Sequence, residues 1–416
     1  MRHFPITILI FVSLAGASPQ SSQTTAPAPT APPLALVNAN VVNVRDGRIT
    51  GNATVVLRNG RIESIGTAPA PTGVAILDLK GKYLLPGLID AHTHASDLAA
   101  FRRALESGVT TVRSAGVSNY VDVGFNELVK RGFAAGPNVI TAGYHVRPQI
   151  APEAFLNNPE YADLMTGVTT LDAMRRAVRM NLAHGVDWIK ILATERAGTP
   201  DTDPRKQVYT EDEIRAIVTE AATRNVPVQA HAHGEEGAMA AVKAGVRSIE
   251  HGTYVSDATL QLMKERGVYF DPTYTTVIDL TEAGGDYDIA ALRIRGEHML
   301  PRLRDAVVRA HRLGVKIVTG GDTGYGPNSL TRIGQEITHF VEMGFKPLEA
   351  IQSATLINAE MLRLEKSIGV VETGFEADVI AVEKNPLERI TTVEDPVLVI
   401  SNGRVAFNRL AFGKQP

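Results

Sequence analysis

The sequence predicts an α/β fold, a (β/α)8 TIM barrel with a small β-sandwich domain formed by both chain ends. Between residues 87 and 366, short apolar strands alternate with amphipathic helical stretches, a pattern typical of βα units around a parallel sheet. The flanking residues 34–86 and 367–412 are rich in strand patterns and hairpin turns. From pattern alone, a doubly wound open sheet is the alternative to the barrel.

The start of the chain predicts an export signal. Arg2 precedes an apolar run from Ile6 to Leu14, and Ala15-Gly16-Ala17 supplies a small-x-small cleavage site, so we expect residues 1–17 to be a signal peptide. An uncleaved anchor is the alternative, but the run is shorter than the roughly 20 apolar residues that span a bilayer. Residues 18–33 contain only Ser, Thr, Gln, Ala and Pro and are expected to be a disordered linker. We therefore expect a periplasmic or secreted protein.

The two flanks are expected to form one β domain. Asn-Gly and Asp-Gly pairs favour tight hairpin turns, and such pairs stand at 46–47, 59–60 and 402–403. The expected strands of this domain are Leu36–Val44, Thr54–Leu57, Arg61–Ile65, Asp378–Glu383, Val397–Ile400 and Val405–Phe407.

The central region contains eight strand candidates, the number that a (β/α)8 barrel of usual size, about 250 residues, requires. They are Leu88–His92, Thr110–Arg113, Asn138–Ala142, Trp188–Leu192, Val226–His231, Ser248–His251, Tyr269–Pro272 and Lys316–Thr319. The clearest helical stretches between them are Thr210–Arg224, Glu235–Ala244, Asp257–Glu265 and Ile289–Leu313.

Composition excludes several classes of protein. The chain has 416 residues, 42 basic and 45 acidic, for a formal net charge of -3, so it carries no electrostatic signature of nucleic-acid binding. It has no cysteine, which excludes disulfides, thiolate metal sites and a cysteine nucleophile. We expect a small-molecule ligand, no nucleic-acid partner, and no membrane attachment once the signal is removed.

Histidines gather at the expected strand ends. The first barrel strand ends in Asp90-Ala91-His92-Thr93-His94, and strand alternation puts His92 and His94 on the same side. Active sites of this fold lie at the C-terminal ends of the strands. The other strand ends carry similar side chains: His145 after the third, Lys190 on the fourth, His231 and His233 on the fifth, His251 on the sixth and Asp322 beyond the eighth.

Imidazoles with a carboxylate and no thiolate suit a metal site. Zinc fits this donor set best among common ions, although manganese, iron, cobalt and nickel are chemically possible. An ammonium group would be repelled by a cation, so Lys190 would act as a neutral or carbon-dioxide-modified ligand. Its alternative role is an ion pair with a carboxylate at the strand mouth. A serine hydrolase is disfavoured because no Gly-x-Ser-x-Gly elbow occurs.

Taken in order, these motifs resemble the amidohydrolase superfamily, and the resemblance runs from about residue 34 to residue 408. Its branch of imidazolonepropionases, Xaa-Pro or Xaa-Arg dipeptidases and amidases that hydrolyse ochratoxin A is the most similar. The motifs are Pro86-Gly87-Leu88-Ile89-Asp90-Ala91-His92-Thr93-His94, Trp188-Ile189-Lys190, Gln229-Ala230-His231-Ala232-His233-Gly234, Ser248-Ile249-Glu250-His251-Gly252, Gly320-Gly321-Asp322-Thr323 and Gly374-Phe375-Glu376-Ala377-Asp378-Val379.

The resemblance implies two zinc ions bridged by carboxylated Lys190. It implies that His92, His94 and Asp322 bind the first ion, and that His231 and His251 bind the second. A hydroxide bridging the ions would attack an amide carbonyl, with Asp322 as general base and acid and His233 or Tyr144 as donor to the carbonyl oxygen. His145, Tyr144, Arg147 and His233 are the implied substrate contacts.

The implied function is a binuclear metal-dependent amidohydrolase that cleaves the amide bond of dipeptides or N-acyl amino acids, with ochratoxin A as one candidate substrate. One alternative is an imidazolonepropionase-like cyclic amidase. Another, in a different class, is a non-catalytic metal-binding scaffold. The resemblance also implies a homo-oligomer of up to eight subunits.

Overall fold

The computed structural model describes residues 31–156 and 158–410. The expected signal peptide (1–17) and most of the expected linker (18–33) lie outside the described residues. Ala31 is buried close to Gly403, so the chain is packed against the β domain from that residue onward.

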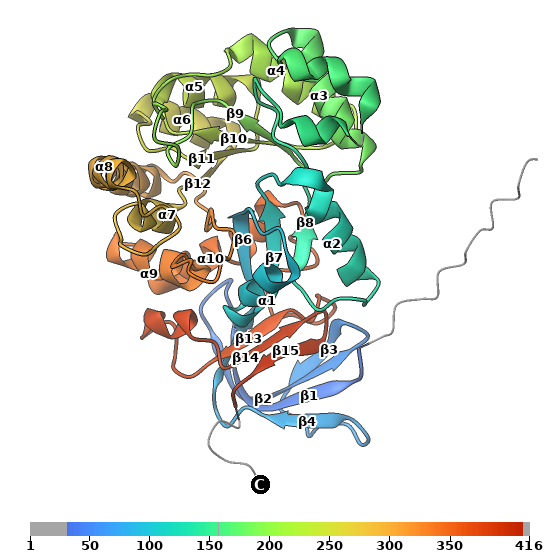
Figure 1. Cartoon of the computed structure of the whole chain (residues 1–416). Helices are drawn as coiled ribbons and strands as arrows, with labels where there is room; N and C mark the ends of the chain where they lie inside the picture. Colours follow the sequence, from blue (N-terminus) through green and yellow to red (C-terminus); the bar gives the residue numbers. More distant parts are fainter. Residues whose placement is uncertain (1–30, 157, 411–416) are drawn as a thin grey trace, which may run out of the picture.

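Both chain ends build one sheet of eight strands, in the order β15-β14-β13-β5-β1-β2-β3 with β4 paired to β1. Apolar side chains from both ends of the chain form one shared cluster in it, for example Leu36, Val55, Leu84, Val379 and Ile400. The sheet appears at the bottom of Figure 1, where the blue and red strands lie together. Its strands are β1 Leu34–Val42, β2 Ile49–Arg58, β3 Arg61–Gly66, β4 Ala75–Asp78, β5 Tyr83–Pro86, β13 Val379–Val382, β14 Leu398–Ser401 and β15 Arg404–Asn408.

The central region is a closed barrel, which confirms the predicted fold class and excludes the open sheet. Seven parallel strands form two arcs, β6-β7-β8 and β9-β10-β11-β12. A parallel bridge between Val146 and Ile191 joins the arcs on one side. On the other side, bridges Phe270–Ile317 and Thr93–Thr323 make the segment 317–323 the eighth member. The named strands are β6 Leu88–Thr93, β7 Val109–Ser114, β8 Asn138–Ile140, β9 Ile189–Leu192, β10 Val228–Ala232, β11 Ser248–His251 and β12 Tyr269–Asp271.

Helices follow the strands and cover the outside of the barrel, as α3 to α6 do over β9 to β11 in Figure 1. Local sequence fixes their ends: Thr210 and Glu213 form a capping box at the start of α4, and Gly245 ends α5 in the left-handed conformation. The helices are α1 Leu98–Glu106, α2 Val121–Lys130, α3 Leu171–Ala183, α4 Glu211–Ala222, α5 Glu235–Ala244, α6 Asp257–Arg266, α7 Tyr274–Asp279, α8 Ala290–Leu313, α9 Ile333–Glu342, α10 Pro347–Ser353 and α11 Leu356–Met361. Short 3-10 turns are η1 Ser118–Tyr120, η2 Pro152–Phe155, η3 Pro159–Thr166 and η4 Ile390–Glu394. A search of the described residues finds no helix long and apolar enough to cross a bilayer.

Candidate active site

The predicted metal ligands meet in one cavity at the C-terminal ends of the barrel strands. His92 lies on β6, Lys190 on β9, His231 on β10 and His251 on β11, while Asp322 lies near the end of the eighth strand segment. All of these residues line the cavity, together with His94 and His233. We refer to it as the inner cavity. Its volume of about 30 Å³ holds water-sized occupants but no organic substrate.

One group of donor atoms surrounds the Asp322 carboxylate. Asp322 Oδ1 lies 3.4 Å from His92 Nε2 and 3.2 Å from His94 Nε2. His94 Nδ1 donates to the carbonyl oxygen of Gly116 at 2.8 Å, and His92 Nδ1 lies 2.8 Å from Glu250 Oε2. These hydrogen bonds occupy Nδ1 of each ring, so the Nε2 lone pairs remain free to bind a cation.

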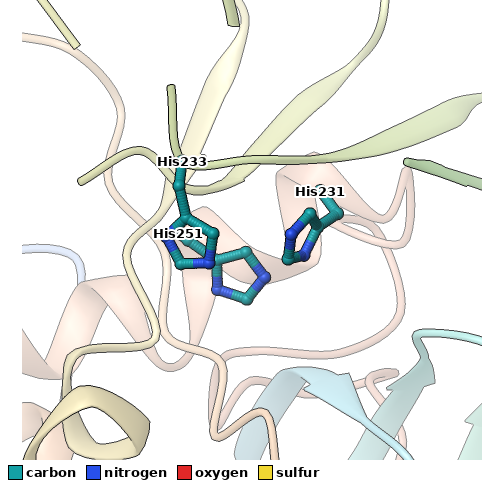
Figure 2. A group of neighbouring side chains, drawn as sticks. All are labelled: His231, His233 and His251. Atoms are coloured by element: carbon teal, nitrogen blue, oxygen red, sulfur yellow. The ribbon is translucent and has the colours of Figure 1, made fainter. Parts of the chain in front are cut away.

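A second group is formed by His231, His233 and His251, each of which offers a nitrogen within 4.8 Å of the others (Figure 2). The Thr273 hydroxyl donates to the Pro272 carbonyl, so it accepts the His251 Nδ1 proton at 2.7 Å. His231 Nε2 donates to the Glu195 carbonyl at 3.1 Å. One lone pair on each of these two rings therefore stays free. His233, predicted as a substrate contact, lies close enough to be a ligand as well.

Lys190 lies between the two groups and is almost fully buried. Its Nζ is 3.3 Å from His92 Nε2, and no carboxylate oxygen within the described ranges lies within 4.0 Å of it. Burial lowers the pKa of Lys190 to about 8, so the neutral amine is accessible near physiological pH. The ion pair considered as an alternative role for this lysine is absent from the described part of the chain.

Burial also favours the neutral form of four of these histidines. It lowers the pKa of His92 to about 4 and that of His233 to about 3, and it holds the pKa values of His231 and His251 well below their usual range. Burial alone would raise the pKa of Asp322, but the neighbouring His92 and His94 hold it well below its usual range. Neutral imidazoles beside a carboxylate are the protonation states that metal binding requires. The residues therefore fit a divalent cation.

A buried charge network beneath the site holds His92 in place. The Arg113 guanidinium lies 2.9 Å from Glu250 Oε2 and stacks 4.6 Å above the Trp188 ring. Burial would raise the pKa of Glu250, but Arg113 and His92 hold it well below its usual range, so the carboxylate fixes the His92 tautomer. Sequence reasoning missed this network. The sequence does contain a sign of it: Arg113 on β7 and Glu250 on β11 are charged residues inside barrel strands, which are buried on both faces.

The backbone at the site is strained in the way that functional sites often are. His251 and Asp322 have φ values of 72° and 44°, in the left-handed region that non-glycine residues avoid. At Gly320, an added Cβ would lie 2.7 Å from His92 Cβ, which only glycine avoids. This stretch of backbone brings Asp322 close to His92 and His94.

A larger outer cavity of about 200 Å³ adjoins the inner one. The two cavities share His94, His145 and Arg196, whereas Tyr144 and Arg147 line the outer cavity only. His145 Nε2 donates to the Ala115 carbonyl, and burial holds its pKa well below the usual range.

Three of the predicted substrate contacts, His145, Tyr144 and Arg147, thus surround the outer cavity. The Tyr144 hydroxyl is already engaged, since it accepts from Asn119 N at 2.8 Å and lies 3.2 Å from Asn119 Oδ1. Sequence reasoning missed Arg196, which lies in the loop after β9. Its only signal was a charge six residues after Lys190, and the path of that loop was not predictable.

Comparison with known proteins agrees with this geometry. The model of the Amidohydrolase family matches residues 83–406. Ochratoxinase from Aspergillus niger is 29% identical, over 88% of this chain and 84% of that protein. Imidazolonepropionase from Micrococcus luteus is 26% identical, over 80% of this chain and 88% of that protein.

A crystal structure of a Xaa-Pro dipeptidase with bound methionine in its active site superposes with a TM-score of 0.80 and 28% identity. The match covers 90% of this chain and 99% of that one. The resemblance inferred from the strand-end motifs is confirmed, and this chain belongs to the amidohydrolase family.

Proposed function

We propose that this protein is a binuclear metal-dependent hydrolase that cleaves the amide bond of dipeptides or N-acyl amino acids with a free C-terminal carboxylate. The observation that carries the proposal is the convergence of six histidines, Lys190 and Asp322 on a single cavity at the strand ends. The ochratoxinase and the Xaa-Pro dipeptidase to which the chain is similar both support an amide-bond substrate.

The proposed ions are two zinc ions, held by His92, His94 and Asp322 on one side and by His231 and His251 on the other, with carboxylated Lys190 between them. The described residues offer two overlapping groups of donor atoms, one of His231, His233 and His251 and one of His92, His251 and Asp322, which supports a pair of neighbouring sites rather than one. When bound, such ions would lower the pKa of a coordinated water toward about 7 and would polarise a carbonyl oxygen.

The protein's own residues would handle the protons. Asp322 is positioned to accept a proton from the attacking water and to deliver it to the leaving amine, since amines leave poorly without protonation. His233 Nδ1 forms a hydrogen bond of 2.9 Å with the Thr253 hydroxyl. The His233 ring is placed to contact the carbonyl oxygen of the substrate. The apolar side chains of Val277 and Leu280 close the other wall of the inner cavity and help exclude water.

The outer cavity would receive the carboxylate end of the substrate. Its rim carries Arg147 and Arg196, and none of its described lining residues is acidic. A free carboxylate would find charge-assisted donors there. This arrangement favours carboxypeptidase-like cleavage over hydrolysis of an internal peptide bond.

The test is hydrolysis of a substrate panel by the purified, zinc-loaded mature protein. The panel pairs Xaa-Pro, Xaa-Arg and Xaa-Phe dipeptides, and N-acyl amino acids including ochratoxin A, with the same compounds as C-terminal amides. We expect cleavage of free acids and weak or no cleavage of the amides. Equal cleavage of acids and amides would contradict the carboxylate requirement. No cleavage of either form, with metal bound, would contradict the proposal itself.

A cyclic amidase is the second candidate, because imidazolonepropionase is also a relative. A cyclic amide as substrate in the same assay separates the two. We further propose a periplasmic or secreted location and a homo-oligomeric assembly, as the export signal and the family resemblance indicate. Fractionation of the native host and light scattering of the purified protein test these two proposals.

A further inference from the structure

Two arginines at the active-site mouth have no hydrogen-bond or ion-pair partner in the described chain. Arg147 follows β8 and Arg196 lies in the loop after β9, and both are half-buried. Within residues 31–156 and 158–410, neither guanidinium has a hydrogen bond or a carboxylate within 4.0 Å. By contrast, Arg295, which also reaches into the protein, donates to four backbone carbonyls.

The two arginines also repel each other. Burial, and then the charge of Arg196, lower the pKa of Arg147, and the charge of Glu153 raises it by less. Two partly desolvated cations with no carboxylate at ion-pair distance are unfavourable until an anion binds between or beside them. The pair thus has the properties of a receptor for negative charge.

Their positions differ in depth. Arg196 lines both the inner and the outer cavity, whereas Arg147 lines only the outer one. The backbone is held on both sides of Arg196: Glu195 N donates to the Lys206 carbonyl at 3.0 Å, and Arg295 donates to the Ala197 carbonyl at 2.5 Å. Arg196 is therefore held at the boundary between the reacting atoms and the outer cavity.

We infer that the two arginines bind two different carboxylates, and that the enzyme prefers substrates whose C-terminal residue is aspartate or glutamate. This inference rests on the proposed function. In such a substrate, the α-carboxylate is one carbon away from the scissile nitrogen, so it lies at the boundary and meets Arg196. The side-chain carboxyl carbon is two bonds from Cα in aspartate and three in glutamate, so it reaches into the part of the outer cavity that Arg147 lines.

The experiment compares isosteric dipeptides that differ in one charge, Ala-Glu against Ala-Gln. We expect kcat/KM for Ala-Glu to exceed that for Ala-Gln by roughly 10- to 100-fold, the range for one charge-assisted hydrogen-bonded contact. Arg147→Gln should bring the ratio close to one. Arg196→Gln should lower kcat/KM for both dipeptides by a similar factor. Arg224→Gln, which changes an exposed arginine preceding β10 at the opposite end of the barrel, is the matched control and should leave the ratio unchanged.

Calorimetric binding of the same dipeptides to metal-free protein gives a readout that does not depend on turnover. Tighter binding of Ala-Glu than of Ala-Gln, with the difference lost in Arg147→Gln, supports the inference even if neither dipeptide is cleaved. A lack of cleavage beside such binding would count against the proposed function alone. Cleavage of both dipeptides with equal kcat/KM and equal affinity would overturn the inference and leave the proposed function standing.

Discussion

At the scale of single residues, Asp322 has two tasks that different substitutions can separate. Its carboxylate faces His92 and His94, and it is both a proposed metal ligand and the proposed proton acceptor for the attacking water. Asp322→Asn keeps the size and one oxygen donor but removes the base. We expect kcat to fall by roughly 10²- to 10⁴-fold, the usual contribution of general acid–base catalysis, while metal content is partly retained.

Elemental analysis and steady-state kinetics on the same preparation check this prediction. The exposed carboxylate of Asp172 on α3 offers a matched control, Asp172→Asn, which should change neither quantity. Near-native turnover of the Asp322→Asn protein would remove Asp322 from the mechanism.

Lys190 is the second residue with a separable role. If it carries a carbamate that bridges two ions, Lys190→Ala should lower the metal content from two equivalents to one or fewer and abolish turnover. The wild-type protein, prepared with ¹³C-bicarbonate, should show a carbamate carbon resonance that is missing in this variant. Lys243→Ala, at an exposed lysine of α5, should keep both the metal and the resonance. Two equivalents of metal in active Lys190→Ala protein would refute the bridging role.

At the scale of elements, the loop of residues 195–207 depends on one side chain of a distant helix. Arg295 on α8 donates to the carbonyls of Ala197, Thr199, Pro200 and Thr202 at 2.5 to 3.0 Å. A bridge between Thr194 and Gln207 closes the base of the loop. Because the same loop carries Arg196, we regard Arg295 as a positioning residue for the substrate-binding end of the site.

Arg295→Gln should therefore weaken substrate binding without loss of metal. Loss of charged donors to four carbonyls should raise KM about tenfold, with a smaller change in kcat. Hydrogen exchange of residues 197–202 should become faster, and Arg295→Lys should restore only part of the protection. Arg312→Gln, at an exposed arginine of the same helix, is the control. An unchanged KM together with faster exchange would show that the loop does not position the substrate.

The elements differ in how far the sequence predicts them. Strands such as Ser248–His251 and helices such as Glu235–Ala244 are found at the predicted residues, because their apolar runs are bounded by polar or glycine residues. The eighth strand is present only as two isolated bridges, at Ile317 and Thr323, with Gly320 and Gly321 between them. The convergence of the proposed metal ligands was predictable because they lie at strand ends. The position of Arg196 was not, because it depends on Arg295, about a hundred residues further along the chain.

At the scale of the whole molecule, one buried carboxyl group contacts both the barrel and the β domain. Asp378 precedes β13, and its Oδ1 accepts from Asn402 N at 2.6 Å while Oδ2 accepts from Asn138 Nδ2 at 3.0 Å. Asn138 begins barrel strand β8, and Asn402 belongs to the hairpin turn of the β domain. Burial is the main reason that the pKa of Asp378 is raised to about 7.

This shift makes the stability of this contact depend on pH. In the unfolded chain the carboxyl group titrates at 3.8, whereas the folded protein keeps its proton until about pH 7. Between these pH values the folded state binds more protons than the unfolded state. The contribution of Asp378 to stability is therefore complete below about pH 4 and is lost as pH rises toward 7. A shift of this size corresponds to at most about 4 kcal/mol.

Other groups titrate over the same range, so a single stability curve cannot isolate Asp378. Burial raises the pKa of Asp90 to about 6 and that of Glu336 to about 7, which adds to the loss of stability with rising pH. The buried histidines act in the opposite sense, because burial lowers their pKa values and the unfolded chain binds the extra protons. The difference between the wild-type protein and one variant cancels these shared contributions.

Asp378→Asn is that variant, because an amide keeps the shape of the side chain and has no proton to lose. We expect the free energy of unfolding of the wild-type protein, minus that of Asp378→Asn, to fall steadily between pH 4.5 and pH 7.5, by about 1–4 kcal/mol, the upper bound being the full pKa shift. Urea unfolding at a series of pH values measures it, and the exposed Asp172→Asn protein should run parallel to the wild type. Parallel curves for Asp378→Asn and the wild type would mean that Asp378 is ionised in the folded protein. Asn138 and Asn402 would then bind a charged carboxylate. The hydrogen bonds between the barrel and the β domain would weaken on acidification instead.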